Sequence, residues 1–174
     1  MHPVVALVKK AVELYVNEGK VITDTGELSE ELAGQAGVFV CLKKKGELRG
    51  CIGTIEPVTG CAGLEAIRNA IASATEDPRF FPVTEDELEQ MDYSVDVLCP
   101  PEKVNSLSAL DPKIYGVIVV QEDRRGILLP DLEGIDTAEE QVRIAMLKAG
   151  IIAEGAGPGK EDTEIYRFQV KRYT

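Results

Sequence analysis

GELRGCIGTI, at residues 46–55, is typical of a β-strand, although it carries glycines at two interior positions. Glycine inside a strand usually marks a bulge or a place where another backbone or a ligand approaches closely. Because side chains alternate between the two faces of a strand, Arg49 and Cys51 are expected to share one face, which Gly53 continues. A guanidinium beside a thiol favours the thiolate, so the stretch predicts either a reactive Cys51 or an inert core cysteine in a glycine-kinked strand.

Strand patterns on either side of a lysine- and glycine-rich turn predict a β-hairpin. The preceding strand covers residues 38–42 (VFVCL), and the following strand covers residues 47–55. The register of this hairpin decides whether Cys41 shares a face with Cys51, because a slip of one residue turns every side chain over. The sequence leaves that register open.

The remaining periodic segments predict the fold class. Helical spacing is found at residues 3–18, 64–75, 85–91 and 137–149, and strand alternation at residues 93–99, 115–120, 127–129 and 166–170. Thr84 and Glu87 have the spacing of a capping box for the third of these helices. Hairpins mixed with helices indicate an α+β fold with a mainly antiparallel sheet. The repeated order of hairpin, helix and strand suggests two pseudo-equivalent halves that form two subdomains around a cleft.

Composition sets limits on the class of protein. A chain of 174 residues, of which 44% are hydrophobic, fits a single domain spanning residues 1–174. The net charge of −11 argues against nucleic-acid binding, and the basic cluster at residues 43–45 is typical of a solvated turn. Without an apolar run long enough for a bilayer or a basic leader at the N-terminus, we expect a cytoplasmic protein with no membrane segment.

The cysteines and the single histidine do not predict a metal site. Cys41, Cys51, Cys61 and Cys99 form no CxxC pair, and His2 lies at the chain end. This spacing indicates neither a structural zinc site nor a disulfide framework. A catalytic Cys51 would lack a histidine base and would need a carboxylate or a lysine instead.

Two further clusters of charged residues are candidates for ligand binding. In the turn DPRF at residues 77–80, proline fixes the backbone between Asp77 and Arg79, which suits a side chain held toward a cleft. These two residues could equally satisfy the turn or pair with each other. Arg125, in RRG at residues 124–126, could bind a carboxylate or phosphate, or lie in a solvated turn. The chain has neither GxxxxGK[ST] nor GxGxxG, so the Gly-Cys-Ile-Gly stretch is not a phosphate loop, and the sequence leaves any cofactor open.

Blocks along nearly the whole chain, from residue 3 to residue 172, resemble the AMMECR domain family. The hallmark is LRGCIG at residues 48–53, and the other blocks are NAIASATEDPRF (69–80), YSVDVLC (93–99), LDPKIYGVIV (110–119), RRGILLPDLEGID (124–136) and EQVRIAMLKAGI (140–151). The initial HisPro and the RRGILLPDLEGID block most resemble the members called protein A of the AmmeMemoRadiSam system. The resemblance implies an α+β domain, often described as two subdomains with a cleft between them. It also implies a Memo-like protein and a radical S-adenosylmethionine protein as partners, but no particular reaction.

Residues and resemblance together predict an accessory component that binds a small polar or anionic ligand or a peptide. We expect Arg49, Arg79 and Arg125 to hold anionic groups and Cys51 to line or anchor the site; the remaining expected site residues are Gly50, Gly53 and Asp77. One alternative is an enzyme that uses Cys51 in a modification reaction. Another is an interaction scaffold in which the glycine-rich strand packs against a partner and the thiol is buried.

Overall fold

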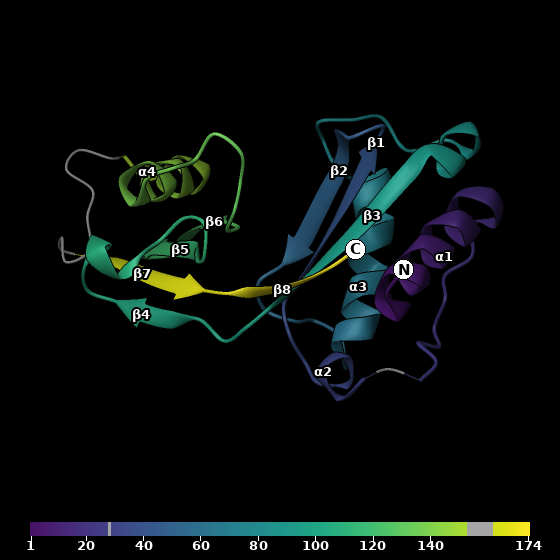
Figure 1. Ribbon diagram of the computed structural model, residues 1–174, viewed down its shortest axis with the longest axis horizontal. Helices are drawn as coiled ribbons and strands as arrows, with labels where there is room; N and C mark the ends of the chain where they lie inside the picture. Colours follow the sequence, from purple (N-terminus) through teal and green to yellow (C-terminus); the bar gives the residue numbers. More distant parts are fainter. Residues whose placement is uncertain (28, 153–161) are drawn as a thin grey trace. The chain divides into compact units, whose positions relative to one another are not determined.

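The chain folds into two compact units. The computed structural model describes residues 1–27, 29–152 and 162–174 (Figure 1). Unit 1 contains Met1–Leu98 together with Lys171–Thr174, and unit 2 contains Cys99–Val170. Each unit is built around its own antiparallel four-stranded sheet, so the predicted α+β class is confirmed.

The sheet of unit 1 has the strand order β2-β1-β3-β8. The elements of this unit are α1 (Pro3–Glu18), α2 (Glu30–Ala33), β1 (Val38–Lys44), β2 (Glu47–Thr54), α3 (Ala62–Thr75), the 3-10 helix η1 (Glu85–Gln90), β3 (Met91–Leu98) and β8 (Val170–Tyr173). The predicted helix at residues 3–18 is confirmed. It begins with proline at its first turn and ends at Gly19, whose φ of 67° is the left-handed conformation that glycine adopts readily.

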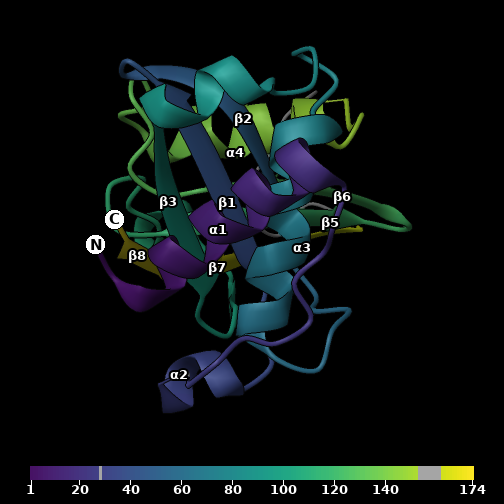
Figure 2. The ribbon, with the colours of Figure 1, turned by 90° about the vertical axis from the view of Figure 1, so that its right-hand side faces the viewer.

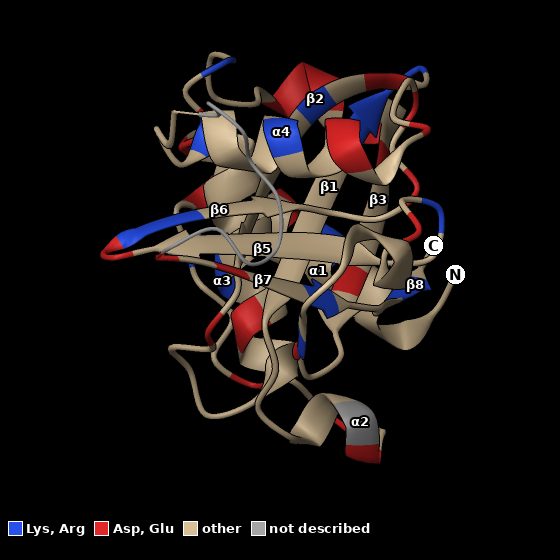
Figure 3. Ribbon diagram, turned by 90° about the vertical axis from the view of Figure 1, so that its left-hand side faces the viewer, with Lys and Arg blue, Asp and Glu red and all other residues tan. Residues whose placement is uncertain are grey.

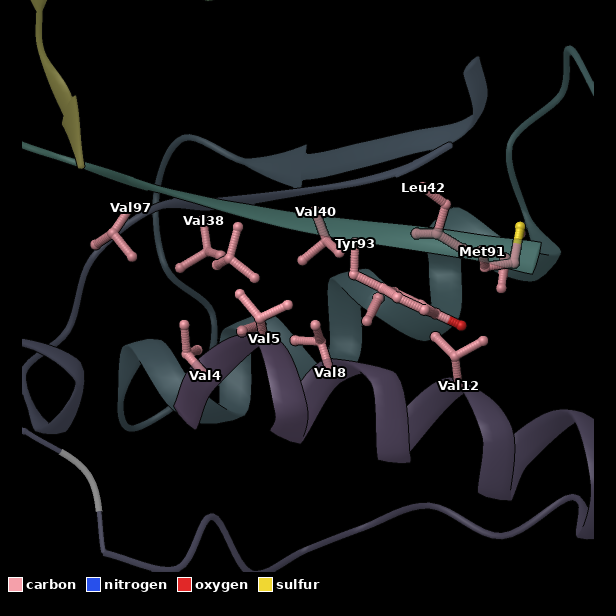
Figure 4. Close-up of a cluster of buried hydrophobic side chains, with 14 of the residues drawn as sticks. Val4, Val5, Val8, Val12, Val38, Val40, Leu42, Met91, Tyr93 and Val97 are labelled. Atoms are coloured by element: carbon pink, nitrogen blue, oxygen red, sulfur yellow. The ribbon is translucent and has the colours of Figure 1, made fainter. Parts of the chain in front are cut away.

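Helices α1 and α3 cover one face of this sheet, as Figure 2 shows. Apolar side chains from α1 point toward the sheet and form the core of unit 1 (Figure 4). On the side of α1 these residues are Val4, Val5, Val8 and Val12, and on the side of the sheet they include Val38, Val40, Leu42, Tyr93 and Val97. Because alternate residues of β1 are buried against the helices, the intervening residues, Cys41 among them, belong to the opposite face.

The predicted hairpin of β1 and β2 is confirmed, and its register is now determined. Cys41 lies directly opposite Cys51. Farther toward the turn, Leu42 pairs with Gly50 but Lys43 pairs with Leu48, so Arg49 is an extra residue in β2. Such a β-bulge breaks the strict alternation of side chains on which the sequence analysis relied.

Unit 2 contains a second hairpin, a helix and two further strands. Its elements are β4 (Glu102–Val104), the 3-10 helix η2 (Leu107–Ala109), β5 (Gly116–Gln121), β6 (Arg124–Leu128), α4 (Ala138–Lys148) and β7 (Thr163–Phe168). The strand order is β4-β7-β5-β6, and α4 packs against β5 and β6 (Figure 1). Thr137 caps α4 by accepting a hydrogen bond from the Glu140 N–H.

The short strands β4 and β8 were not predicted, because three or four residues carry too little alternation to be recognised. In both units the strand after the helix pairs antiparallel with the first strand of the hairpin: β3 with β1, and β7 with β5. The equivalence of the two halves itself stays a prediction. Within the described residues, we find no helix whose length and apolar content would allow it to span a bilayer.

Candidate functional site

The site centres on Cys41 and Cys51, which we call the thiol pair. They lie opposite each other on β1 and β2, and both side chains are partly exposed. The N–H of Cys51 donates to the Asp77 carboxylate at 2.9 Å rather than to β1. Cys41 and Cys51 are therefore a non-hydrogen-bonded pair, the type in which facing Cα atoms of antiparallel strands are closest, at about 4.5 Å.

The two thiols shift each other's pKa in opposite directions. A hydrogen bond with the Cys51 thiol lowers the pKa of Cys41 to about 7, against the opposing effect of burial, and Lys43 adds to the lowering. The same hydrogen bond, together with burial and the charge of Cys41, raises the pKa of Cys51 well above its usual value. The directions of the two shifts favour a thiolate at Cys41 that accepts a hydrogen bond from the Cys51 thiol. That Cys51 itself is reactive stays a prediction.

Asp77 holds the outer edge of β2 next to the thiol pair. Its carboxylate is almost completely buried and accepts hydrogen bonds from the Cys51 N–H and from the Nε and Nη2 of Arg79, at 2.9 Å, 2.9 Å and 2.7 Å. Arg79 also approaches the Cys51 carbonyl, with its Nη2 3.5 Å from the oxygen. These bonds, with those from Arg79 first, hold the pKa of Asp77 well below its usual range. The DPRF turn therefore pairs Asp77 with Arg79, one of the alternatives that the sequence left open, and brings both residues to Cys51. That they face a cleft stays a prediction.

Arg49 pairs with Glu87, a residue that the sequence analysis assigned only to a helix cap. The Nε and Nη2 of Arg49 donate to the two carboxylate oxygens of Glu87 at 3.1 Å and 2.9 Å. Lys44 donates to the same carboxylate at 2.9 Å, and the Thr84 N–H does so at 3.1 Å. Arg49 and then Lys44 thereby hold the pKa of Glu87 well below its usual range, in spite of its burial. The expected pairing of Arg49 with the Cys51 thiol is not what the structure shows, since Arg79 is the arginine whose charge acts on Cys51.

The ring of Phe80 connects the two arginines. The guanidinium carbons of Arg49 and Arg79 lie 5.8 Å and 5.5 Å from the ring centroid, within the range of a cation–π interaction. Each arginine is therefore held by one carboxylate and by the same aromatic ring. Their exposure differs, since the side chain of Arg79 is 54% exposed and that of Arg49 is 15% exposed.

Three buried polar residues of α3, spaced four apart, bind the hairpin from its helix side. The Ser73 hydroxyl accepts from the Ile52 N–H and donates to the Val40 carbonyl, both at 2.8 Å. Asn69 donates to the Val38 carbonyl at 2.9 Å. Glu65 accepts from Thr54, Val58 and Thr59; burial opposes its ionisation, but these bonds outweigh it and lower its pKa. In the sequence, this arrangement is visible as three polar residues at intervals of four in an alanine-rich helix.

The two glycines of LRGCIG have different neighbours. A Cβ on Gly50 would collide with the backbone carbonyl of Ser73, so glycine is needed there for α3 to approach β2. A Cβ on Gly53 would collide with the ring of Phe39, which lies opposite Gly53 on β1. Gly50 thus serves helix packing, and the space beside Gly53 is filled by an aromatic ring.

Arg125 belongs to unit 2, whereas the other predicted site residues belong to unit 1. It lies on β6 opposite Val120, in a hairpin whose tip carries both acidic and basic residues (Figure 3). The neighbouring Arg124 donates to the Gly150 carbonyl at 3.1 Å. The structure thus brings together Arg49, Gly50, Cys51, Gly53, Asp77 and Arg79 in one unit, and places Arg125 on the other.

The described residues contain no cluster of three or more histidine, cysteine or acidic side chains arranged to hold a metal ion. The thiol pair and the two carboxylate–arginine pairs are therefore what this part of the chain offers for chemistry. One residue of the thiol pair, Cys51, and one arginine, Arg49, lie on the glycine-containing strand β2, to which the Asp77 carboxylate is also bonded.

Comparison with known proteins shows what kind of protein carries this arrangement. The family model described as AMMECR1 matches residues 5–173, so the chain belongs to the AMMECR1 family. A protein of Thermotoga maritima is 54% identical over 99% of this chain and 97% of its own length. A protein of Clostridium acetobutylicum is 46% identical over 98% of this chain, which corresponds to only 36% of that longer protein. The crystal structure of an uncharacterized protein from Pyrococcus horikoshii is 32% identical, with a TM-score of 0.87 over 97% of this chain and 88% of that one.

Proposed function

We propose that this protein is a cytoplasmic accessory component that binds a small polar or anionic ligand, or a peptide carrying such a group, beside Cys51. The observation that carries the proposal is the position of Arg79. Asp77 fixes its Nε and Nη2 next to Cys51, while 54% of the side chain stays exposed. A guanidinium has five N–H donors in a rigid plane, so the edge opposite Asp77 can still bind a carboxylate or phosphate oxygen.

Arg49 has a supporting part in this proposal. Its guanidinium is mostly buried and is shared with Glu87, so an incoming anion would have to displace an existing ion pair. The bond between Arg49 and Glu87 instead fixes β2 to the segment that follows the DPRF turn, and Phe80 lies against both arginines. Arg79 would therefore contact the ligand and Arg49 would position the strand.

The proposed partners are a Memo-like protein and a radical S-adenosylmethionine protein. Their support is the resemblance to protein A of the AmmeMemoRadiSam system. The region of the Clostridium acetobutylicum relative that is similar to this chain is 36% of that protein.

The ligand proposal is tested by thermal unfolding with a panel of small carboxylates and phosphate esters. At least one class should raise the Tm of the wild-type protein, because a ligand that binds only the folded state stabilises it by mass action. Arg79→Gln should abolish that rise. Arg143→Gln is the matched control, because Arg143 is 53% exposed, lies on α4 of unit 2 and should leave the rise unchanged. The proposal fails if no compound acts, or if both variants respond like the wild type.

The partner proposal is tested separately by co-expression with the Memo-like and radical S-adenosylmethionine proteins of the same genome. Co-purification with either protein at a fixed stoichiometry is the expected result. If both partners elute separately from a folded wild-type protein, the accessory role is wrong even where the ligand is bound.

A further inference from the structure

We propose that Cys41 and Cys51 form a reversible cross-strand disulfide by exchange with a low-molecular-weight disulfide, so that the thiol pair is a redox site of this protein. The inference does not depend on the ligand proposed above. It rests on the register of one hairpin, on the hydrogen bonds that hold that hairpin, and on the exposure of the two sulfurs.

The register satisfies the geometric requirement for a disulfide. Cys41 and Cys51 are directly opposite, and the bond from the Cys51 N–H to Asp77 makes them a non-hydrogen-bonded pair. Facing residues of such a pair have Cα atoms about 4.5 Å apart, within the range of roughly 4.4–6.8 Å that disulfides span. Both side chains belong to the sheet face away from α1 and α3, so no core residue separates them.

The backbone around the pair is held in place on both strands. Asp77 binds the Cys51 N–H, Ser73 bridges the next residue of β2 to Val40 of β1, and β1 is also paired along its length with β3. The two sulfurs already share a hydrogen bond, so they lie side by side on these strands. A bond between them would not require the strands to separate or slip.

The charges around the pair assign a role to each sulfur. Lys43 and Arg172 favour the thiolate at Cys41, Asp96 opposes it, and the Cys51 thiol donates to it. Near Cys51, Arg79 favours ionisation, while Asp96 and the charged Cys41 oppose it. On this distribution of charge, Cys41 attacks the small disulfide first, and Cys51 then resolves the mixed disulfide by attacking Cys41.

The exchange balances in two steps. The Cys41 thiolate attacks one sulfur of the small disulfide, whose S–S bond breaks and releases one thiolate, leaving a mixed disulfide on Cys41. Cys51 then gives its proton to the released thiolate and attacks the Cys41 sulfur, which expels the second small thiolate. The two protein sulfurs are oxidised by two electrons in total, and the small disulfide is reduced to one small thiol and one small thiolate.

The other two cysteines supply matched controls. Cys61 lies in the N-cap position of α3 and Cys99 follows β3, and neither is a register partner of another cysteine in the described sheets. All four cysteines are free of disulfide bonds and partly exposed in the structure. If exposure alone decided which cysteines form disulfides, all four would react. The proposal instead predicts a disulfide only between Cys41 and Cys51.

The test equilibrates the full chain in buffers of reduced and oxidised glutathione, blocks free thiols with an alkylating reagent and maps the peptides by mass spectrometry. We expect a peptide linked through Cys41 and Cys51, formed equally in the Cys61→Ser Cys99→Ser double variant. Cys51→Ser should instead accumulate glutathione on Cys41. Cys41→Ser should acquire glutathione on Cys51 about tenfold more slowly than Cys51→Ser acquires it on Cys41 at neutral pH, because a thiol with an ordinary pKa of about 8.5 is ionised less than Cys41 with its pKa of about 7.

Either of two results would overturn the proposal. One is the absence of a linked peptide from a protein whose circular dichroism stays native at the most oxidising ratio. The other is a linked peptide that involves Cys61 or Cys99 in preference to the thiol pair. Both serine variants keep a hydroxyl that can hydrogen-bond in place of the thiol. If one variant does not fold, the other variant and the peptide map of the wild type still test the proposal.

Discussion

In each unit a glycine allows a helix to contact the second strand of a hairpin closely, but the side chains around the two glycines differ. In unit 1, Gly50 on the second hairpin strand lies against the backbone carbonyl of Ser73 in α3. In unit 2, Gly126 on the second hairpin strand lies against the backbone carbonyl of Ala145 in α4. Each glycine follows an arginine, Arg49 in β2 and Arg125 in β6. The arginine–glycine step is therefore common to both hairpins.

The difference between the units shows which part of the motif serves architecture. Both glycines let a helix contact a strand closely, so this feature alone does not indicate a site. Unit 1 adds a buried hydroxyl where unit 2 has Ala145, and adds Asp77, which binds the strand from its open edge. Asp77 binds the N–H of Cys51 and Ser73 binds the N–H of the next residue, so both hold the backbone beside the thiol pair, which is why we assign the site to unit 1.

The largest expected effect comes from adding one methyl group at either glycine. Gly50→Ala and Gly126→Ala should each lower the free energy of unfolding by about 3 kcal/mol, because the new Cβ meets backbone that cannot rotate away. Urea unfolding measures the loss, and amide hydrogen exchange locates it: β1 and β2 for Gly50→Ala, β5 and β6 for Gly126→Ala.

Gly60→Ala is the control for both substitutions, since a Cβ at Gly60 would have no neighbour within 4 Å. Its effect should stay within about 0.5 kcal/mol. A Gly50→Ala protein as stable as Gly60→Ala would show that the close contact between α3 and β2 does not stabilise unit 1. Gly50 and Gly126 would then not have the same role.

The second largest effect should come from Asp77, which binds the outer edge of β2 in unit 1. At neutral pH, Asp77→Asn should cost about 2 kcal/mol, because a nearly buried carboxylate that joins Arg79 to the Cys51 N–H is replaced by a neutral amide. Asp92→Asn, at an exposed position of β3, is the control and should change the stability little.

The pH dependence of the same variant sharpens this prediction. The pKa of Asp77 is lower in the folded protein than in the unfolded chain, since Arg79 and the backbone N–H groups favour its charged form. The stabilisation is therefore complete above about pH 4 and is lost as the pH falls through the depressed folded-state pKa. Urea midpoints of wild type and Asp77→Asn should converge in acid. A difference that stays constant down to pH 2 would mean that the carboxylate charge is not what holds β2.

The hairpins and longer helices were predictable because their signals are local. Alternating apolar residues, a lysine–glycine turn and the spacing of Thr84 and Glu87 all lie within a few residues of the structure that they specify. The DPRF turn could also be recognised from Asp77 and Arg79, since proline and the flanking charges are adjacent in the sequence.

The partners within the site depend on contacts between distant residues, which local patterns do not encode. Glu87 is 38 residues from Arg49, and its role as a helix cap already explained its charge. The proximity of Cys41 and Cys51 depends on the hairpin register, and the bulge at Arg49 interrupts the alternation that would indicate it. The expected pairing of Arg49 with Cys51 was wrong because that alternation was assumed to continue.

The smallest of the three effects should come from Ser73→Ala, which gives α3 the residue type that α4 has at its own glycine contact. Removing the hydroxyl leaves the Ile52 N–H and the Val40 carbonyl without the group that joins them, at a cost of about 1.5 kcal/mol. Thr75→Ala, which removes a hydroxyl bonded only within the same helix, is the control and should cost less. Hydrogen exchange of the Ile52 amide should accelerate in Ser73→Ala alone. Unchanged exchange there would mean that β1 and β2 pair without help from α3.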